Sequence, residues 1–205
     1  MMILSSNGLS SEPLLTAAKK HAAHGNAALV VTADHVYKER NYHVERVSKE
    51  LKHLGLTVDY FDFDTQTPQA LSTYDCVELI GGNPYYLLHS ILSHGFQSVL
   101  KTFAESKMLI GWSAGASVLG PNLALINLYT PEMNIVNLND LSALHFTDIQ
   151  ILPHYGKFLT RFPDFEERCA RYEQNTTSRV IRLNDGEGII IDGQTSTLIQ
   201  LPSPS

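Results

Sequence analysis

The chain has little that would bind a metal or cross-link the fold. It contains two cysteines, Cys76 and Cys169, which form no Cys-X-X-Cys pair. Its nine histidines show neither a His-Glu-X-X-His motif nor another paired spacing typical of a bound metal. We therefore expect both thiols to be reduced packing residues, and we expect no metal site.

Excess positive charge and long apolar runs are also missing. Lysine and arginine number 15 against 21 acidic residues, which gives a net charge of −6 and disfavours binding to nucleic acid or an anionic membrane. No apolar run approaches the about 18 residues that a membrane span needs. Residues 1–13 lack the basic and apolar regions of a secretory signal. We expect a cytoplasmic protein whose partner is a small soluble molecule.

Length and composition favour one folded unit. With 43% hydrophobic residues, 18% charged residues and a mean hydropathy of −0.08, the chain can build a sizeable core. Its 205 residues suit a single α/β domain, which we predict over residues 1–205. Composition leaves the oligomeric state open, a homodimer included.

Short apolar or β-branched runs alternate with stretches of helical period. The strands predicted in the first part of the chain are 2–5, 27–32, 57–61, 76–80 and 108–111. Residues 85–105 are predicted to form one helix. This alternation is typical of a doubly wound, mostly parallel sheet flanked by helices.

The pattern changes after residue 120. Residues 123–128 and 134–138 look extended, and 149–152 has the composition of another core strand. A helix is predicted at 165–174. Closing strands are predicted at 179–183, 188–191 and 197–201.

Residues 108–117 carry the most informative motif. A buried-strand pattern runs into Gly111-Trp112-Ser113-Ala114-Gly115, just before a predicted helix. This is the sequence form of a nucleophile elbow, in which glycines relieve crowding where a sharp turn exposes the serine. The motif predicts Ser113 as a nucleophile. In the alternative interpretation, Ser113 only caps the following helix.

A serine hydroxyl is a weak nucleophile, so it needs a neighbouring base and donors for the developing oxyanion. His154 directly follows the strand predicted at 149–152, where α/β sheets place reactive side chains. His43 is expected on a solvated helix face instead. The backbone N–H groups of Gly82 and Ala114 are the predicted oxyanion donors. In the alternative interpretation, His154 is an ordinary loop histidine and Gly82 only belongs to a tight turn between a strand and a helix.

Several segments resemble the peptidase E family, serine peptidases whose fold is similar to class I glutamine amidotransferases. The matching segments are 3–7, 79–83, 110–116, 152–154 and 184–188, and Gly-Trp-Ser-Ala-Gly-Ala is the specific one. The resemblance implies a serine exopeptidase that hydrolyses dipeptides with an N-terminal aspartate through an acyl-enzyme. It implies Ser113 as nucleophile and His154 as general base, with no metal and no organic cofactor.

The resemblance also implies a third, acidic catalytic residue and a cation that meets the substrate carboxylate. Glu132, just before Met133, matches the family's acid, although the family has Asp there and a shorter spacing from the serine. Asp185 is the alternative acid, with Glu187 two residues on. The candidate substrate-binding residues are Asn83, Arg161, Arg168 and Arg171.

Two other functions stay open. An amide or isopeptide hydrolase of the same fold, such as a cyanophycinase relative, would be favoured by a reshaped pocket around residues 155–172. A non-catalytic, amidotransferase-like binding module would be favoured if the acid and the histidine lay far from Ser113. Glutamine amidotransferase activity is disfavoured, because the resembled fold uses a cysteine nucleophile where this chain has Ser113.

Overall fold

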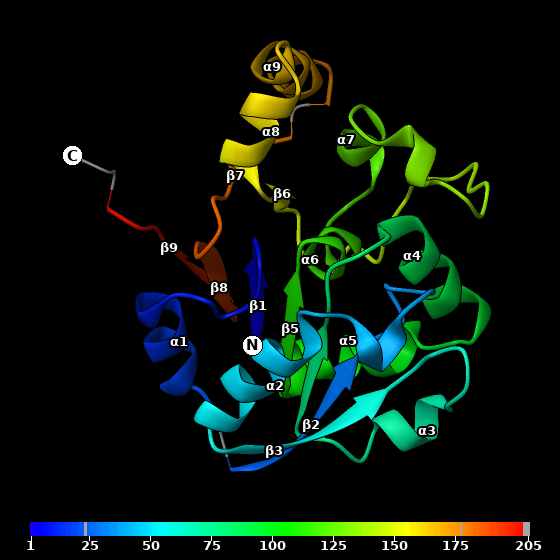
Figure 1. Ribbon diagram of the computed structural model, residues 1–205, viewed down its shortest axis with the longest axis vertical. Helices are drawn as coiled ribbons and strands as arrows, with labels where there is room; N and C mark the ends of the chain where they lie inside the picture. The colour runs from blue at the N-terminus through cyan, green and yellow to red at the C-terminus, as the bar shows by residue number, and fades with distance from the viewer. Residues whose placement is uncertain (23, 177, 203–205) are drawn as a thin grey trace.

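The computed structural model describes residues 1–22, 24–176 and 178–202, and its main feature is a seven-stranded sheet (Figure 1). The strand order is β3-β2-β4-β5-β1-β8-β9. The strands are β1 (Met2–Ser5), β2 (Gly25–Val30), β3 (Leu56–Phe61), β4 (Cys76–Leu79), β5 (Met108–Trp112), β8 (Gly188–Asp192) and β9 (Thr195–Ile199). The strands β1 to β5 pair in parallel, whereas β8 and β9 pair antiparallel. The predicted α/β class with a mostly parallel sheet is confirmed.

Helices connect the parallel strands, as the alternating pattern predicts. They are α1 (Glu12–Lys19), α2 (Val44–His53), α3 (Pro68–Leu71), α4 (Pro84–Ser93), α5 (Gln97–Ser106) and α6 (Ala114–Leu119), with the 3-10 turn η1 (Lys38–Arg40) before α2. The prediction of one helix over residues 85–105 is wrong, because the helix is interrupted between α4 and α5. At the break, Gly95 has a φ of +73°, a conformation that glycine adopts readily.

A second, smaller cluster of elements lies beyond the end of the sheet to which β1 and β5 point (Figure 1). It contains α7 (Ala124–Asn127), η2 (Pro131–Met133), β6 (Gln150–Leu152), α8 (Tyr155–Arg161), α9 (Phe165–Thr176) and β7 (Val180–Arg182). Strands β6 and β7 pair in parallel as a separate two-stranded sheet. Its apolar core consists of Leu125, Tyr129, Leu152, Phe165, Cys169, Tyr172 and Val180.

Three predictions for this region need correction. Residues 123–128, expected to be extended, contain the helix α7. Residues 134–138 form a turn, because the Asn134 side chain bonds both the N–H and the carbonyl of Leu138. The strand expected at 149–152 pairs with β7 and not with the main sheet.

Both cysteines are buried and free, as predicted. Burial raises the pKa of the Cys76 thiol well above its ordinary value and that of Cys169 to about 11. Both thiols are therefore protonated at neutral pH and behave as packing groups. Among the helices of the described residues, none is long and apolar enough to cross a membrane.

Candidate active site

Ser113 occupies a sharp turn between β5 and α6. Its φ is +50° and its ψ is −112°, a region that residues with a side chain rarely adopt. Such a conformation costs on the order of 1–3 kcal/mol and persists only where the surrounding structure enforces it. Here the Ser113 N–H donates to the carbonyl of Ser5 at 3.0 Å, and the Ser113 carbonyl accepts from Ser117. The turn has the form of the predicted nucleophile elbow.

The two glycines of the motif allow this turn to pack tightly. A Cβ added at Gly111 would lie 2.6 Å from the carbonyl oxygen of Gly115. A Cβ added at Gly115 would lie 2.1 Å from the carbonyl oxygen of Leu79 in β4. Neither position has space for a side chain, so the glycines let α6 start directly against β4 and β5.

His154 follows β6 and precedes α8, with a left-handed φ of +57°. Its backbone N–H donates to the Ser6 hydroxyl at 2.9 Å. Its ring reaches two predicted site residues: Nε2 lies 3.0 Å from Ser113 Oγ, and Nδ1 lies 2.6 Å from Asp185 Oδ1. Because a carboxylate only accepts, Nδ1 carries the proton and Nε2 accepts from the serine hydroxyl.

Asp185 is held by three donors. Besides His154, the Ser6 hydroxyl donates to Oδ1 at 2.9 Å, and Lys157 Nζ lies 2.5 Å from Oδ2. The hydrogen bond from His154, together with those from Lys157 and Ser6, holds the pKa of Asp185 well below its ordinary value in spite of partial burial. The carboxylate is therefore ionised at neutral pH and can orient the His154 ring.

Glu132 does not reach the histidine. It is exposed in η2, and within the described residues it makes no hydrogen bond or ion pair. Burial and the charge of Glu132 raise the pKa of Tyr85 to about 12. The structure thus brings the alternative acid, Asp185, to His154. Glu187 is also absent from the site, because its buried carboxylate accepts from the N–H groups of Asn184 and Leu201.

One predicted oxyanion donor, Gly82, lines the same cavity as Ser113, and the other, Ala114, directly follows Ser113 in the chain. Gly82, after β4, has a φ of +144°, and an added Cβ would lie 2.5 Å from the carbonyl oxygen of Ala33. In the described part of the chain, the Gly82 N–H has no acceptor. Ala114 is the first residue of α6, where the backbone N–H has no partner within the helix. Both N–H groups are thus available to a bound ligand.

A cavity of about 400 Å³ lies over the hydroxyl of Ser113, between Gly82 and the first turns of α8. Lys157 and Arg161 line it, whereas its lining contains no Asp or Glu among the residues described. Lys157 is paired with Asp185, but Arg161 has no ion pair in this part of the structure. The cavity is therefore suited to an anionic ligand group.

The other predicted substrate-binding residues point elsewhere. Arg168 pairs with Asp164 at 2.7 Å, and Arg171 pairs with Glu167 at 2.5 Å, both on the exposed side of α9. Asn83 Oδ1 caps α4 by accepting from the N–H groups of Tyr85 and Tyr86. Its Nδ2 donates to the Met133 carbonyl. These three residues hold structure together, which leaves Arg161 as the arginine at the cavity.

The expectation that His43 lies on a solvated surface is wrong. Its ring packs edge-on against Trp112, with centroids 5.3 Å apart, and it lines the cavity. Partial burial and the charges of Arg46 and Lys157 lower its pKa. The sequence does not reveal this position of His43, because its neighbours along the helix are polar. Only the tertiary fold brings the start of α2 next to Trp112.

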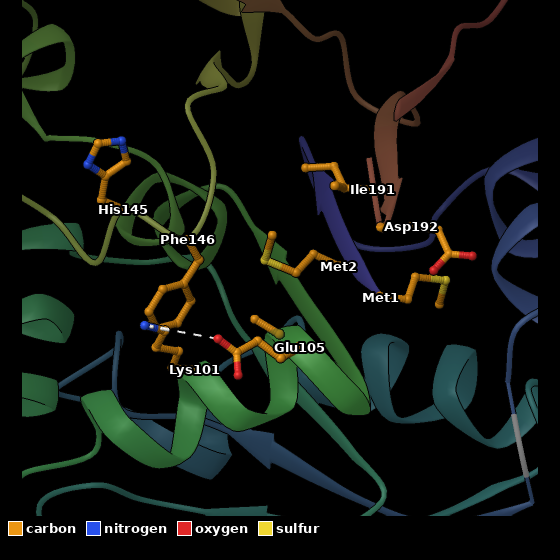
Figure 2. Close-up of a pocket in the computed structure, with 10 residues that line it drawn as sticks. Met1, Met2, Lys101, Glu105, His145, Phe146, Ile191 and Asp192 are labelled. Carbon is orange, nitrogen blue, oxygen red and sulfur yellow. Dashed lines mark ion pairs between the residues drawn. The ribbon is translucent and has the colours of Figure 1, made fainter. Parts of the chain in front are cut away.

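A second cavity, of about 390 Å³, lies near the start of β1 (Figure 2). Met1, Met2 and the exposed Lys101–Glu105 ion pair surround it. It contains none of the predicted site residues. In the described residues, no group of three or more His, Cys, Asp or Glu side chains is placed to hold a metal ion.

Comparison with known proteins supplies the family. The model of peptidase family S51 matches residues 1–199. The chain belongs to peptidase family S51. An uncharacterized peptidase of Listeria monocytogenes is 30% identical over 89% of this chain and 89% of its own. Peptidase E of Shewanella amazonensis is 25% identical over 77% of this chain and 67% of its own.

Solved structures agree with the S51 assignment. The crystal structure of a candidate peptidase E protein from Listeria monocytogenes superposes with a TM-score of 0.79 at 28% identity, covering 98% of both chains. A peptidase from an acI-B1 actinobacterium has the same fold, with a TM-score of 0.70 at 16% identity over 97% of this chain and 86% of the other. The predicted resemblance to peptidase E is confirmed, and the protein is a peptidase.

Proposed function

We propose that this S51 peptidase is a serine exopeptidase that hydrolyses dipeptides with an N-terminal aspartate. The observation that carries the proposal is the continuous chain of contacts from Ser113 through His154 to Asp185, with distances of 3.0 and 2.6 Å. A non-catalytic binding module would not need these groups within hydrogen-bond distance of one another.

The first step is acylation of the serine. Ser113 Oγ attacks the peptide carbonyl while His154 Nε2 takes the hydroxyl proton, and ionised Asp185 stabilises the resulting imidazolium. The backbone N–H groups of Gly82 and Ala114 donate to the oxyanion of the tetrahedral intermediate. His154 then gives its proton to the leaving amine, which breaks the peptide bond and leaves an ester on Ser113.

The second step is hydrolysis of that ester. His154, neutral again, takes a proton from water, and the resulting hydroxide equivalent attacks the ester carbonyl. Collapse of the second tetrahedral intermediate returns the proton to Ser113 Oγ and releases the N-terminal amino acid. No metal or organic cofactor takes part in this scheme.

The charge and size of the cavity support an acidic, short substrate. Arg161 supplies a guanidinium with no ion pair in the described structure, and a carboxylate is its natural partner. We assign the aspartate side chain of the substrate to this group. A volume of about 400 Å³ lies in the range of small-molecule sites, which favours a short peptide over a protein segment.

The test is hydrolysis of Asp-Leu, Glu-Leu, Asn-Leu and Ala-Leu by wild type, Ser113→Ala and Arg161→Met. We expect selective cleavage of Asp-Leu by wild type and none by Ser113→Ala. Arg161→Met should reduce the preference for Asp-Leu over Asn-Leu, whereas Arg179→Met, at an exposed arginine before β7, should keep it. Equal cleavage of all four peptides would refute the specificity, and turnover by Ser113→Ala would refute the mechanism.

A further inference from the structure

A further cavity, of about 640 Å³, lies next to the catalytic one. Asn41, Tyr42 and Gly82 line both cavities, so the predicted oxyanion donor Gly82 stands at their boundary. The outer wall comes from the loop between β2 and α2 and from Met133 in η2. A ligand held at Ser113 can therefore extend past Gly82 into this second space.

The wall of this cavity is largely apolar and aromatic. Val36 is 56% exposed, Tyr37 is 59% exposed and Tyr42 is 83% exposed, although all three are large hydrophobic side chains. Met133 completes the wall. Exposed apolar groups gathered around one hollow indicate a place where an apolar ligand group is bound.

Arg40 is the arginine in the largely apolar lining of this cavity. In the described structure, its guanidinium has neither an ion pair nor a hydrogen bond. Asp34 is the acid in the same lining, but its carboxylate is occupied by the N–H groups of Val36 and Tyr37 and by the Asn41 side-chain amide. Arg40 is thus free to bind an anion from outside.

An apolar side chain beside a carboxylate is the chemistry of a C-terminal amino acid residue. We propose that this cavity is the subsite for the second residue of the dipeptide, with Arg40 binding its C-terminal carboxylate. Tyr37 and Met133 then contact its side chain. Because Gly82 lines both cavities, we assign the first residue of the dipeptide to the side of Arg161 and the second residue to the side of Arg40. The assignment rests on the dipeptidase function proposed above.

This subsite accounts for the length of the substrate. A guanidinium binds a carboxylate with two parallel hydrogen bonds, and this pairing is lost when the carboxylate is an amide or is carried further along a longer peptide. Arg40 thereby selects peptides that end one residue after the cleaved bond. Arg161 and Arg40 together would bind the aspartate side chain and the C-terminal carboxylate of the dipeptide.

The experiment compares Asp-Leu, Asp-Leu amide and aspartyl p-nitroanilide with wild type and Arg40→Met. In wild type, Asp-Leu should have the higher kcat/KM of the two peptides. Arg40→Met should lower the ratio of kcat/KM for Asp-Leu to that for Asp-Leu amide by roughly 10- to 100-fold, the range expected for one charge-assisted pair. The matched control Arg179→Met, also at an exposed arginine, should keep the wild-type ratio. Circular dichroism melting verifies that each variant is folded.

Each other result would overturn the assignment in a different way. An unchanged ratio in folded Arg40→Met would show that Arg40 does not bind the carboxylate. Equal losses on Asp-Leu and on aspartyl p-nitroanilide would show that Arg40 contacts the aspartate residue and not the leaving group. A folded wild type that cleaves none of the three would refute the dipeptidase function itself, and the subsite with it.

Discussion

Replacing Asp185 by asparagine tests the acid that the structure places beside His154. Asp185 Oδ1 accepts from both the His154 ring and the Ser6 hydroxyl. The asparagine side chain would be nearly the same size, but its NH₂ group can donate to Nδ1. The ring would then carry its proton on Nε2, facing Ser113, and could no longer accept the serine proton.

The expected loss follows from this change of tautomer. Orienting acids in Ser-His-Asp sites contribute roughly 10⁴-fold in kcat, and each tenfold is about 1.4 kcal/mol of activation free energy. Asp185→Asn should therefore raise the barrier by about 5 kcal/mol. KM should change little, because Asp185 lies behind His154 and is not among the described residues that line the substrate cavity.

The assay is hydrolysis of Asp-Leu under saturating substrate, with Glu132→Gln as the matched control. Glu132 is exposed and has no contact with His154 in the described structure, so its variant should keep wild-type kcat within about twofold. A folded Asp185→Asn variant with kcat within tenfold of wild type would refute the assignment. So would a loss in Glu132→Gln that equals the loss in Asp185→Asn.

Three further predictions concern two residues that support the site and one buried acid in β4. Gly115→Ala, whose Cβ would lie 2.1 Å from the Leu79 carbonyl, should cost about 1–3 kcal/mol in urea unfolding, and an unchanged midpoint would contradict this. Ser6→Ala removes a hydrogen-bond donor to Asp185 and the acceptor of the His154 backbone N–H. The kcat should fall roughly tenfold, and an unchanged kcat would show that Ser6 does not position these two residues. Glu78 is buried without a hydrogen bond, and burial and the charge of Glu50 raise its pKa. Above the unfolded pKa of about 4.3, the unfolded chain ionises Glu78 while the folded protein keeps it protonated, so the free energy of unfolding falls as pH rises. Relative to Glu78→Gln, wild type should lose about 1.4 kcal/mol of this free energy per pH unit until the folded pKa is reached. Parallel pH curves from urea unfolding of the two proteins would contradict this.

The parallel sheet and the elbow could be predicted because their signals are local. Apolar runs of strand length identify β1, β2, β4 and β5 without reference to the rest of the chain. The elbow needs only two glycines around Ser113 and a strand in front of it. The break at Gly95 was missed because the apolar stripe continues on both sides, and one glycine does not reveal its backbone angle.

The acid depends on long-range pairing, which no local pattern shows. Strand β8 pairs antiparallel with β1, where Ser5 lies opposite Gly188, and the Ser6 N–H donates to the Glu187 carbonyl. This pairing fixes the turn that holds Asp185 next to Ser6 and His154. The match to the family's acid just before Met133 favoured Glu132 over Asp185, because such a match follows the order of residues along the chain and not the register of a closing strand.

The proposed catalytic groups are divided between two separately packed apolar cores. Ser113 follows β5 of the main sheet, whereas His154 directly precedes α8, whose Tyr155 and Phe158 pack on the second core around Phe165. Because β6 and β7 form no ladder with the main sheet, we expect this second core to open at a lower free energy than the whole chain. Such sub-global opening would carry the base away from an intact nucleophile. In rising denaturant, activity should then disappear before the far-ultraviolet signal of the sheet.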